Sequence, residues 1–183
     1  MKKIIFFLMV LVFLIFFGTN KMTEKTVGFD YDSTLSFSTP NFKAERTEDP
    51  ADRLAWDLIN GRLLSLEKRK HIAWLVSLSK LLGYTPIVIT ARNEVNGDLF
   101  RTHVQRTYGV KSEDVYMTKE KAQVLKDRHT IVFFGDSDGD ITEAQKAGVT
   151  GIRVKRSEDD EYKEHYHPGQ YGEFILPLSA AHE

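Results

Sequence analysis

Two short acidic motifs carry side chains that could together bind a hard cation and a phosphate group. The first, Asp30-Tyr31-Asp32, directly follows an apolar run at 26–29. In extended backbone, residues two apart point the same way, so both carboxylates are expected to face one site. A bound Mg²⁺, which prefers oxygen ligands, would relieve their mutual repulsion. One carboxylate could then attack phosphorus while the other transfers a proton, whereas an isolated Asp-x-Asp is more often a solvated turn.

The second acidic motif, GDSDGD at 135–140, follows the strongest apolar run of the chain. Asp136 is expected to be a metal ligand, and Asp140 to orient either a metal-bound water or a lysine. An EF-hand calcium loop is the competing interpretation. It is rejected because Ile141 and Ala147 occupy the positions that require a glycine and a bidentate glutamate.

Hydroxyl and cationic side chains accompany these carboxylates. Thr90 ends a third apolar run, and its hydroxyl with the next backbone N–H could hold a phosphate oxygen, although a helix N-cap is the ordinary role of such a threonine. Lys121 could offset charge on a transferring phosphoryl group, while the basic residues around it suggest a solvated helix face. Arg92 could hold its loop by ion pairing or contact the substrate, and the sequence leaves both roles open.

The elements that must position these residues alternate between strand and helix. Alternating patterns predict right-handed βαβ crossovers and an α/β fold, here a Rossmann-like three-layer sandwich with a mostly parallel sheet. Ligands bind beyond the carboxyl ends of such strands, which is where the polar residues above fall. The predicted strands are 26–29, 86–89, 115–117, 130–134 and 151–154, and the predicted helices that follow them are 97–108, 119–127 and 141–147.

A small helical cap insertion is expected at about 36–64, between the first strand and the next crossover helix. Ser38-Thr39-Pro40 is expected to break the chain, and a helix capped by Asp49 with Pro50 in its first turn to run to Gly61. A second helix is expected to start at Ser65 and to bury an apolar stripe up to Leu82.

The N-terminus indicates export. A basic start, Met1-Lys2-Lys3, precedes an uninterrupted apolar run at 4–17, so residues 1–20 are interpreted as a signal peptide or an N-terminal membrane anchor. No good small-x-small cleavage site follows, which keeps inner-membrane anchoring by 4–17 as the alternative to a free periplasmic protein. The chain has no cysteine, and its net charge of −1 gives no general attraction for nucleic acid.

The two acidic motifs, Thr90 and Lys121 occur in the order of the four motifs of haloacid-dehalogenase-type (HAD) phosphatases. Among these proteins, the chain resembles the class B bacterial acid phosphatases. The resemblance rests on FDYDSTLSFSTPNF at 29–42, Ile89-Thr90, Lys121, FGDSDGDITEA at 134–144 and GIRV at 151–154. It covers about residue 26 to the end and is weakest between 43 and 85. It implies one HAD-like domain over 21–183, periplasmic location and Mg²⁺ dependence.

The resemblance also implies the role of each site residue. Asp30 would be the nucleophile and a magnesium ligand, Asp32 the general acid–base and a ligand through its carbonyl, and Asp136 the third ligand. Phosphate would be held by Thr90, the amide of Ala91 and Lys121. A pocket for the organic part of the substrate would be formed by Phe42, Trp56 and Tyr162.

The sequence therefore predicts an acid phosphatase acting on nucleoside and aryl monophosphates through an aspartyl-phosphate, with phosphotransfer as a second activity. The alternatives are a HAD phosphatase of narrower substrate range, such as a 5′-nucleotidase or sugar phosphatase, and a non-catalytic phosphate- or metal-binding module. No nucleic acid partner is expected. A homo-oligomer is compatible with the resemblance, but the segment before Asp30 is shorter than the family's assembly arm.

Overall fold

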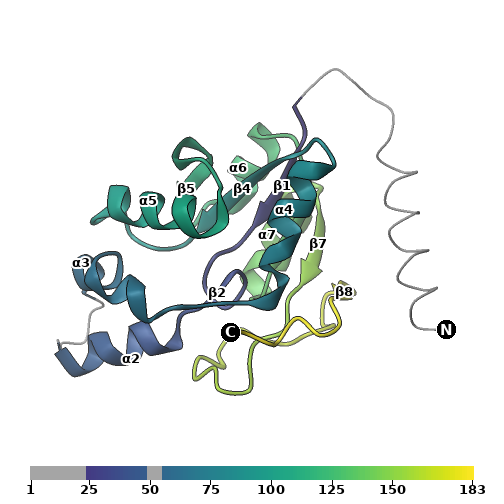
Figure 1. The fold of residues 1–183 in the computed structure, drawn as a ribbon. Coiled ribbons are helices and arrows are strands. Elements are labelled where there is room, and N and C mark those ends of the chain that lie inside the picture. Colours follow the sequence, from purple (N-terminus) through teal and green to yellow (C-terminus); the bar gives the residue numbers. More distant parts are fainter. Residues whose placement is uncertain (1–23, 49–54) are drawn as a thin grey trace.

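The computed structural model describes residues 24–48 and 55–183, and its centre is a six-stranded sheet of order β5-β4-β1-β6-β7-β8 (Figure 1). Every neighbouring pair of strands in this sheet is parallel. The strands are β1 (Thr26–Phe29), β4 (Thr85–Thr90), β5 (Val115–Met117), β6 (Thr130–Gly135), β7 (Thr150–Arg153) and β8 (Phe174–Ile175). The predicted parallel α/β fold is confirmed.

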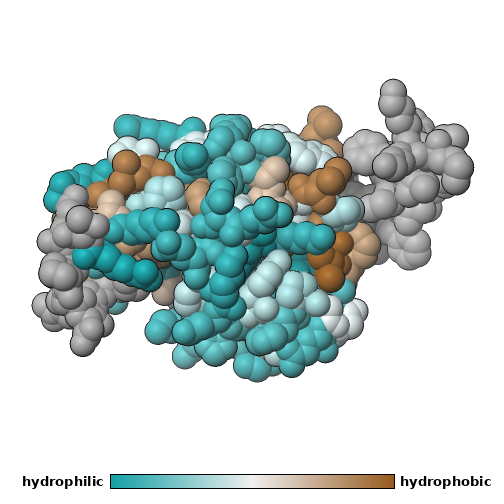
Figure 2. All heavy atoms as spheres, turned by 90° about the horizontal axis from the view of Figure 1, so that it is seen from below, coloured by the Kyte–Doolittle hydropathy of each residue, from teal (hydrophilic) through white to brown (hydrophobic). Residues whose placement is uncertain are grey.

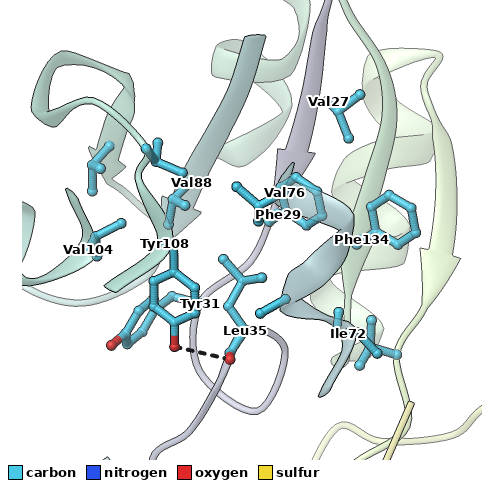
Figure 3. Close-up of a cluster of buried hydrophobic side chains, with 14 of the residues drawn as sticks. Val27, Phe29, Tyr31, Leu35, Ile72, Val76, Val88, Val104, Tyr108 and Phe134 are labelled. Carbon is cyan, nitrogen blue, oxygen red and sulfur yellow. Dashed lines mark hydrogen bonds between the residues drawn. The ribbon is translucent and has the colours of Figure 1, made fainter. Parts of the chain in front are cut away.

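Helices cover both faces of the sheet, because successive strand residues point to opposite sides. On β4, Val88 belongs to the core cluster that includes residues of α4 (Trp74–Leu81) and α5 (Gly97–Tyr108). Its neighbours Ile87 and Ile89 belong to the cluster that includes residues of α6 (Lys121–Asp127) and α7 (Asp138–Ala147). Figure 3 shows part of the first cluster, where Val88, Val104 and Tyr108 lie together.

A second group of elements lies between β1 and α4, beyond the carboxyl ends of the strands (Figure 1). It includes the segment predicted as the insertion. The elements are β2 (Ser36–Phe37), α2 (Thr39–Glu48), α3 (Trp56–Ile59), the 3₁₀ turn η1 (Arg62–Leu66), β3 (Lys68–Arg69) and the 3₁₀ turn η2 (His71–Ala73). The molecule seen from this end is hydrophilic across its middle, with apolar surface toward its flanks (Figure 2).

Two predictions for this segment are wrong. Ser38-Thr39-Pro40 does not break the chain but starts α2, because proline in a first helical turn lacks only an N–H that would have no partner there. The helix predicted from Ser65 begins only at Trp74. Before it, β3 pairs antiparallel with β2, so backbone hydrogen bonding between distant segments overrides the local helical pattern.

The remaining differences lie at element ends and near the C-terminus. α7 begins at Asp138, three residues before the predicted start, because Ser137 and Asp140 form a capping box. α6 begins at Lys121 rather than at 119, and β8 was not predicted. The predicted cap at Asp49-Pro50 and the leader at 1–20 lie outside the described residues. Within 24–48 and 55–183, no helix has the length and apolarity to cross a membrane.

Candidate active site

Strand β1 delivers Asp30 to the edge of the sheet. The backbone N–H of Asp30 donates to the carbonyl of Phe134 at 2.8 Å, which continues the pairing with β6. The carbonyl of Tyr31 then accepts from the N–H groups of Leu35 and Ser36, at 2.9 and 3.0 Å, so the chain turns immediately after the nucleophile candidate. Asp30 is buried at this turn, with 5% of its surface exposed.

Three buried carboxylates and one ammonium meet at this point. Asp30, Asp136 and Asp140 each place an oxygen within 4.8 Å of the others. The Nζ of Lys121 donates to Asp30 and, at 2.7 Å, to Asp140. Gly135 makes this approach feasible, because a Cβ atom there would lie 2.3 Å from the Cβ of Asp140. The sequence predicted that these four side chains share a site, with Asp140 orienting other groups; here its carboxylate belongs to the cluster itself.

The charges in this cluster strongly perturb one another. Burial, together with the negative charge of Asp140, raises the pKa of Asp30 well above its usual range. Burial and Asp140 likewise raise the pKa of Asp136 against the opposing effect of Arg156. Burial also disfavours ionisation of Asp140, but Lys121 outweighs it and lowers the pKa. Three carboxylates held this close, two of them reluctant to ionise, suit a hard divalent cation, which would offset the repulsion with oxygen ligands.

Asp136 is also held by Thr34 of the first motif and by Arg156, which lies outside the motifs. Its Oδ1 accepts from the hydroxyl of Thr34 at 3.1 Å, and its Oδ2 from Nε of Arg156 at 2.5 Å. Arg156 lies three residues beyond the end of β7, and its Nη1 also donates to the carbonyl of Tyr162 at 2.6 Å. Sequence reasoning missed Arg156. The rule that polar groups beyond strand ends line the site would have found it, had it been applied to β7.

Asp32 points to a different partner from Asp30. Its carboxylate receives a bidentate pair from Arg92, with Nη2 at 2.6 Å from Oδ1 and Nε at 3.0 Å from Oδ2. Burial opposes ionisation of Asp32, but the guanidinium of Arg92 and its hydrogen bonds lower the pKa. β1 ends at Phe29, and the carboxylate of Asp32 pairs with Arg92 instead of joining the cluster of Asp30, Asp136 and Asp140.

The end of β4 supplies buried polar groups next to Asp32. Thr90 is fully buried, and its hydroxyl lies 3.4 Å from Oδ2 of Asp32 while accepting from the backbone N–H of Arg92 at 3.3 Å. Ala91 is exposed between them. Arg92, left open by the sequence, holds the loop by ion pairing, and its side chain has no exposed surface.

The three aromatic candidates fall into two places. Phe42 of α2 and Trp56 of α3 make an edge-to-face contact with ring centroids 6.4 Å apart, and the guanidinium of Arg92 lies 5.7 Å from the Phe42 ring. Tyr162 is half-exposed on the loop after β7, where its ring lies 5.0 Å from the guanidinium of Arg156. That loop is joined to α2 by an ion pair of 2.8 Å between Lys43 and Glu161.

Two buried charged residues between the predicted insertion and α4 were also missed. Lys70 donates to the carbonyls of Ser33 and Lys155, at 2.8 and 2.6 Å, and so joins the turn after β1 to the loop after β7. Glu67 pairs with Arg92 at 2.5 Å. Both fell inside the segment predicted as a regular helix, in a run of charged residues at 67–71 that is ordinarily a solvent-facing stretch, so no signal in the sequence pointed to them.

Comparison with known proteins finds phosphatases among the relatives of the chain. No family model matches the chain. A class B acid phosphatase of Rahnella sp. (strain Y9602) is 30% identical over 167 residues, which are 82% of this chain and 70% of that protein. One from Marinomonas sp. (strain MWYL1) is 30% identical with the same coverage, and one from Salmonella typhi is 26% identical over 86% of this chain and 75% of that protein.

Solved structures of the same fold are more distant in sequence. A predicted phosphoglycolate phosphatase from Haemophilus somnus superposes with a TM-score of 0.57 at 13% identity, covering 87% of this chain and 97% of that one. A phospho-aspartyl intermediate analogue of phosphoserine phosphatase gives a TM-score of 0.53 at 14% identity, covering 73% and 87%.

The fold is that of the HAD-type phosphatases, and the relatives make the chain a phosphoric monoester hydrolase. Within that class, the chain belongs to the class B acid phosphatase family, as its resemblance to that family predicted.

Proposed function

We propose that the chain is a Mg²⁺-dependent phosphatase that hydrolyses small phosphate monoesters through a covalent aspartyl-phosphate on Asp30. One observation carries the proposal. A buried carboxylate at a strand end is paired with Lys121, lies among Asp136 and Asp140, and stands two residues from a carboxylate on a separate partner, Arg92. A nucleophile and an acid–base need different environments, and the two carboxylates have them. Without a cation the pKa of Asp30 is raised and that of Asp32 is lowered, the reverse of what the two roles need. The proposal therefore requires bound Mg²⁺ to favour the ionised form of Asp30, and the negative charge of the substrate phosphate to favour the protonated form of Asp32.

In the first step, a carboxylate oxygen of Asp30 attacks phosphorus and the ester P–O bond breaks. Lys121 and the hydroxyl of Thr90, with the backbone amide of the exposed Ala91, hold the equatorial oxygens as negative charge develops on them. Asp32 donates its proton to the departing ester oxygen, which leaves as a neutral alcohol.

In the second step, water attacks the phosphorus of the aspartyl-phosphate. Asp32, now ionised, takes a proton from the water, the Asp30–phosphorus bond breaks, and inorganic phosphate leaves. An alcohol in place of water would give a new phosphate ester, so the same residues would catalyse phosphotransfer.

Asp30, Asp136 and the carbonyl oxygen of Asp32 are the groups proposed to hold Mg²⁺. The ion would supply positive charge that offsets the carboxylates and the phosphoryl oxygens. Asp140 would keep Lys121 directed at Asp30, since it accepts a hydrogen bond of 2.7 Å from that ammonium.

The edge-to-face pair of Phe42 and Trp56 supports a substrate with a flat organic group. Rings in such a wall favour nucleoside and aryl monophosphates by stacking, and Tyr162 would add to the same wall from the loop after β7. The basic and apolar start of the chain supports export, with action in the periplasm or on the outer side of the inner membrane.

Phosphate release from a panel of monoesters tests the proposal. Protein starting at Lys21 should hydrolyse aryl and nucleoside monophosphates with Mg²⁺ and lose this activity in Asp30→Asn, while the exposed Asp98→Asn serves as a matched control with unchanged turnover. Activity that survives Asp30→Asn would mean another nucleophile. Hydrolysis of only one ester in the panel would replace the broad substrate range with a narrow one.

A further inference from the structure

Glu67 is a buried carboxylate outside all four motifs. It follows η1 and precedes β3, and its side chain is 2% exposed. Four groups donate to it. They are the Tyr31 hydroxyl at 2.5 Å and the Ser36 hydroxyl at 3.1 Å on Oε2, and Nδ2 of Asn41 at 2.6 Å and Nη2 of Arg92 at 2.5 Å on Oε1.

Arg92 connects Glu67 to Asp32. The same Nη2 that donates to Glu67 donates to Asp32 at 2.6 Å, and Nε completes the bidentate pair at 3.0 Å. The guanidinium lies between two rings, 4.8 Å from the centroid of Tyr31 and 4.9 Å from that of Phe100. The guanidinium also donates to Oδ1 of Asn60 at 3.5 Å and to Oγ of Ser38 at 3.4 Å, so its short contacts are those to the two carboxylates.

A guanidinium has planar geometry, so fixing one edge of it fixes the other. Glu67 holds Arg92 from the side of the insertion, and Arg92 presents Nη2 and Nε to Asp32 on the side of the site. Asp32 keeps 28% of its side chain exposed, whereas the Arg92 side chain has none. The carboxylate of Asp32 is therefore oriented by Arg92 and remains partly exposed to solvent.

We propose that Glu67 is a positioning residue, which acts through Arg92 to hold the Asp32 carboxyl in the orientation for proton transfer to the leaving group. This inference rests on the proposed function, in which Asp32 is the acid–base. In the step concerned, the Asp30–phosphorus bond forms, the ester P–O bond breaks, and the proton moves from Asp32 to the ester oxygen.

A purely structural role for Glu67 makes a different prediction. Its bonds to Tyr31, Ser36 and Asn41 join the turn after β1 to α2, and loosening them would lower turnover of every substrate alike. Misplacing a proton donor instead harms substrates in proportion to their need for the proton. An alkoxide needs protonation to leave, whereas 4-nitrophenolate leaves unaided.

Glu67→Gln separates the two roles because glutamine keeps the shape and can satisfy all four neighbours. Its oxygen can accept from Arg92 and Asn41, and its amide N–H groups can donate to the Tyr31 and Ser36 hydroxyls, which accept as readily as they donate. Only the charge facing Arg92 is lost, so a weaker neutral hydrogen bond replaces the ion pair that holds the guanidinium, and Arg92 together with the Asp32 carboxyl is held less firmly. The quantity to measure is kcat/KM, because it ends with phosphoryl transfer to Asp30 and excludes the later hydrolysis.

We expect kcat/KM of Glu67→Gln to fall by about 10-fold or more for an alkyl monophosphate and by less than about 3-fold for 4-nitrophenyl phosphate. Asp114→Asn is the matched control. Asp114 is a buried carboxylate paired with Arg128 at 2.7 Å, but it precedes β5 and so lies at the amino ends of the strands. Its variant should leave the ratio of the two kcat/KM values unchanged.

Equal losses for both substrates, or no loss for either, would overturn the inference. Should Glu67→Gln fail to fold by circular dichroism, Glu67→Asp, which withdraws the carboxylate by one methylene, should shift the ratio in the same direction, and an unshifted ratio there overturns the inference too. Failure of the proposed function has a separate signature, since 4-nitrophenyl phosphate turnover would then survive Asp30→Asn.

Discussion

The two halves of the candidate site are built differently. The half that carries Asp30, Asp136, Asp140 and Lys121 stands at the tips of β1 and β6 and the first turns of α6 and α7. The half that carries the aromatic pair and Glu67 lies on α2, α3 and the residues around η1, which are not part of the six-stranded sheet. Regular elements fix the first half, whereas long-range side-chain bonds fix the second. Changes in the first should affect every substrate alike, and changes in the second should affect substrate choice and stability.

Removal of divalent metal should have the largest effect. Chelation is expected to abolish turnover of all monoesters, because the repulsion among Asp30, Asp136, Asp140 and the phosphate would then be offset less, by side-chain cations such as Lys121 and Arg156. Phosphate release before and after dialysis against a chelator measures this, and Mg²⁺ should restore it. Full activity after exhaustive chelation would show that the carboxylate cluster needs no divalent metal for turnover.

Loss of Lys121 should come next. Lys121→Met is expected to lower kcat by about 10²- to 10³-fold, the usual effect of removing one group that stabilises developing charge. Lys126→Met, on the exposed side of the same helix, is the matched control and should leave kcat unchanged. Substrate-dependent losses in Lys121→Met would contradict the division between the two halves.

The first half of the site could be predicted from the sequence more readily than the second, because regular elements position the first and long-range side-chain bonds position the second. The positions of Asp30, Thr90 and Asp136 follow from strand ends, because parallel strands deliver their carboxyl ends to one edge whatever connects them. No such rule covers Glu67 or Lys70. Their places depend on β2–β3 pairing and on the hydrogen bond of 2.9 Å from the Lys70 N–H to the Leu35 carbonyl, and a local helical pattern over the same residues concealed both.

Asp32 shows where the two kinds of information meet. Its position in the chain follows from the motif, but its direction is set by Arg92, and Arg92 is held in turn by Glu67. The spacing of two residues predicted that the carboxylates of Asp30 and Asp32 face one site, whereas the Asp32 carboxylate pairs with Arg92 outside the three-carboxylate cluster. Sequence spacing misses this because an ion-pair partner from a separate segment sets its direction.

Lys70 should sharpen the comparison through stability. Burial lowers its pKa from 10.5 to about 8, so between these values the unfolded chain binds a proton that the folded chain has released. The free energy of unfolding should therefore rise as pH increases from about 8 to 10.5, by up to about 3 kcal/mol relative to Lys70→Met. Urea unfolding of both proteins across that range measures the difference, which cancels all other titrations. A constant difference would show that Lys70 stays protonated in its place.

Trp56 should give the smallest effect and the most selective one. Trp56→Ala is expected to raise KM for nucleoside and aryl monophosphates by about 10-fold, the value of one stacking contact, and to leave small alkyl phosphates nearly unchanged. Tyr162→Ala should follow the same direction with a smaller loss, because Tyr162 is half-exposed and packs on Arg156, whereas Trp56 contacts Phe42. Leu81→Ala, a highly exposed apolar side chain on α4, is the control. Equal rises in KM for aryl and alkyl substrates would show that these aromatic side chains do not contact the organic part of the substrate. The half of the site on α2 and α3 would then have only a structural role.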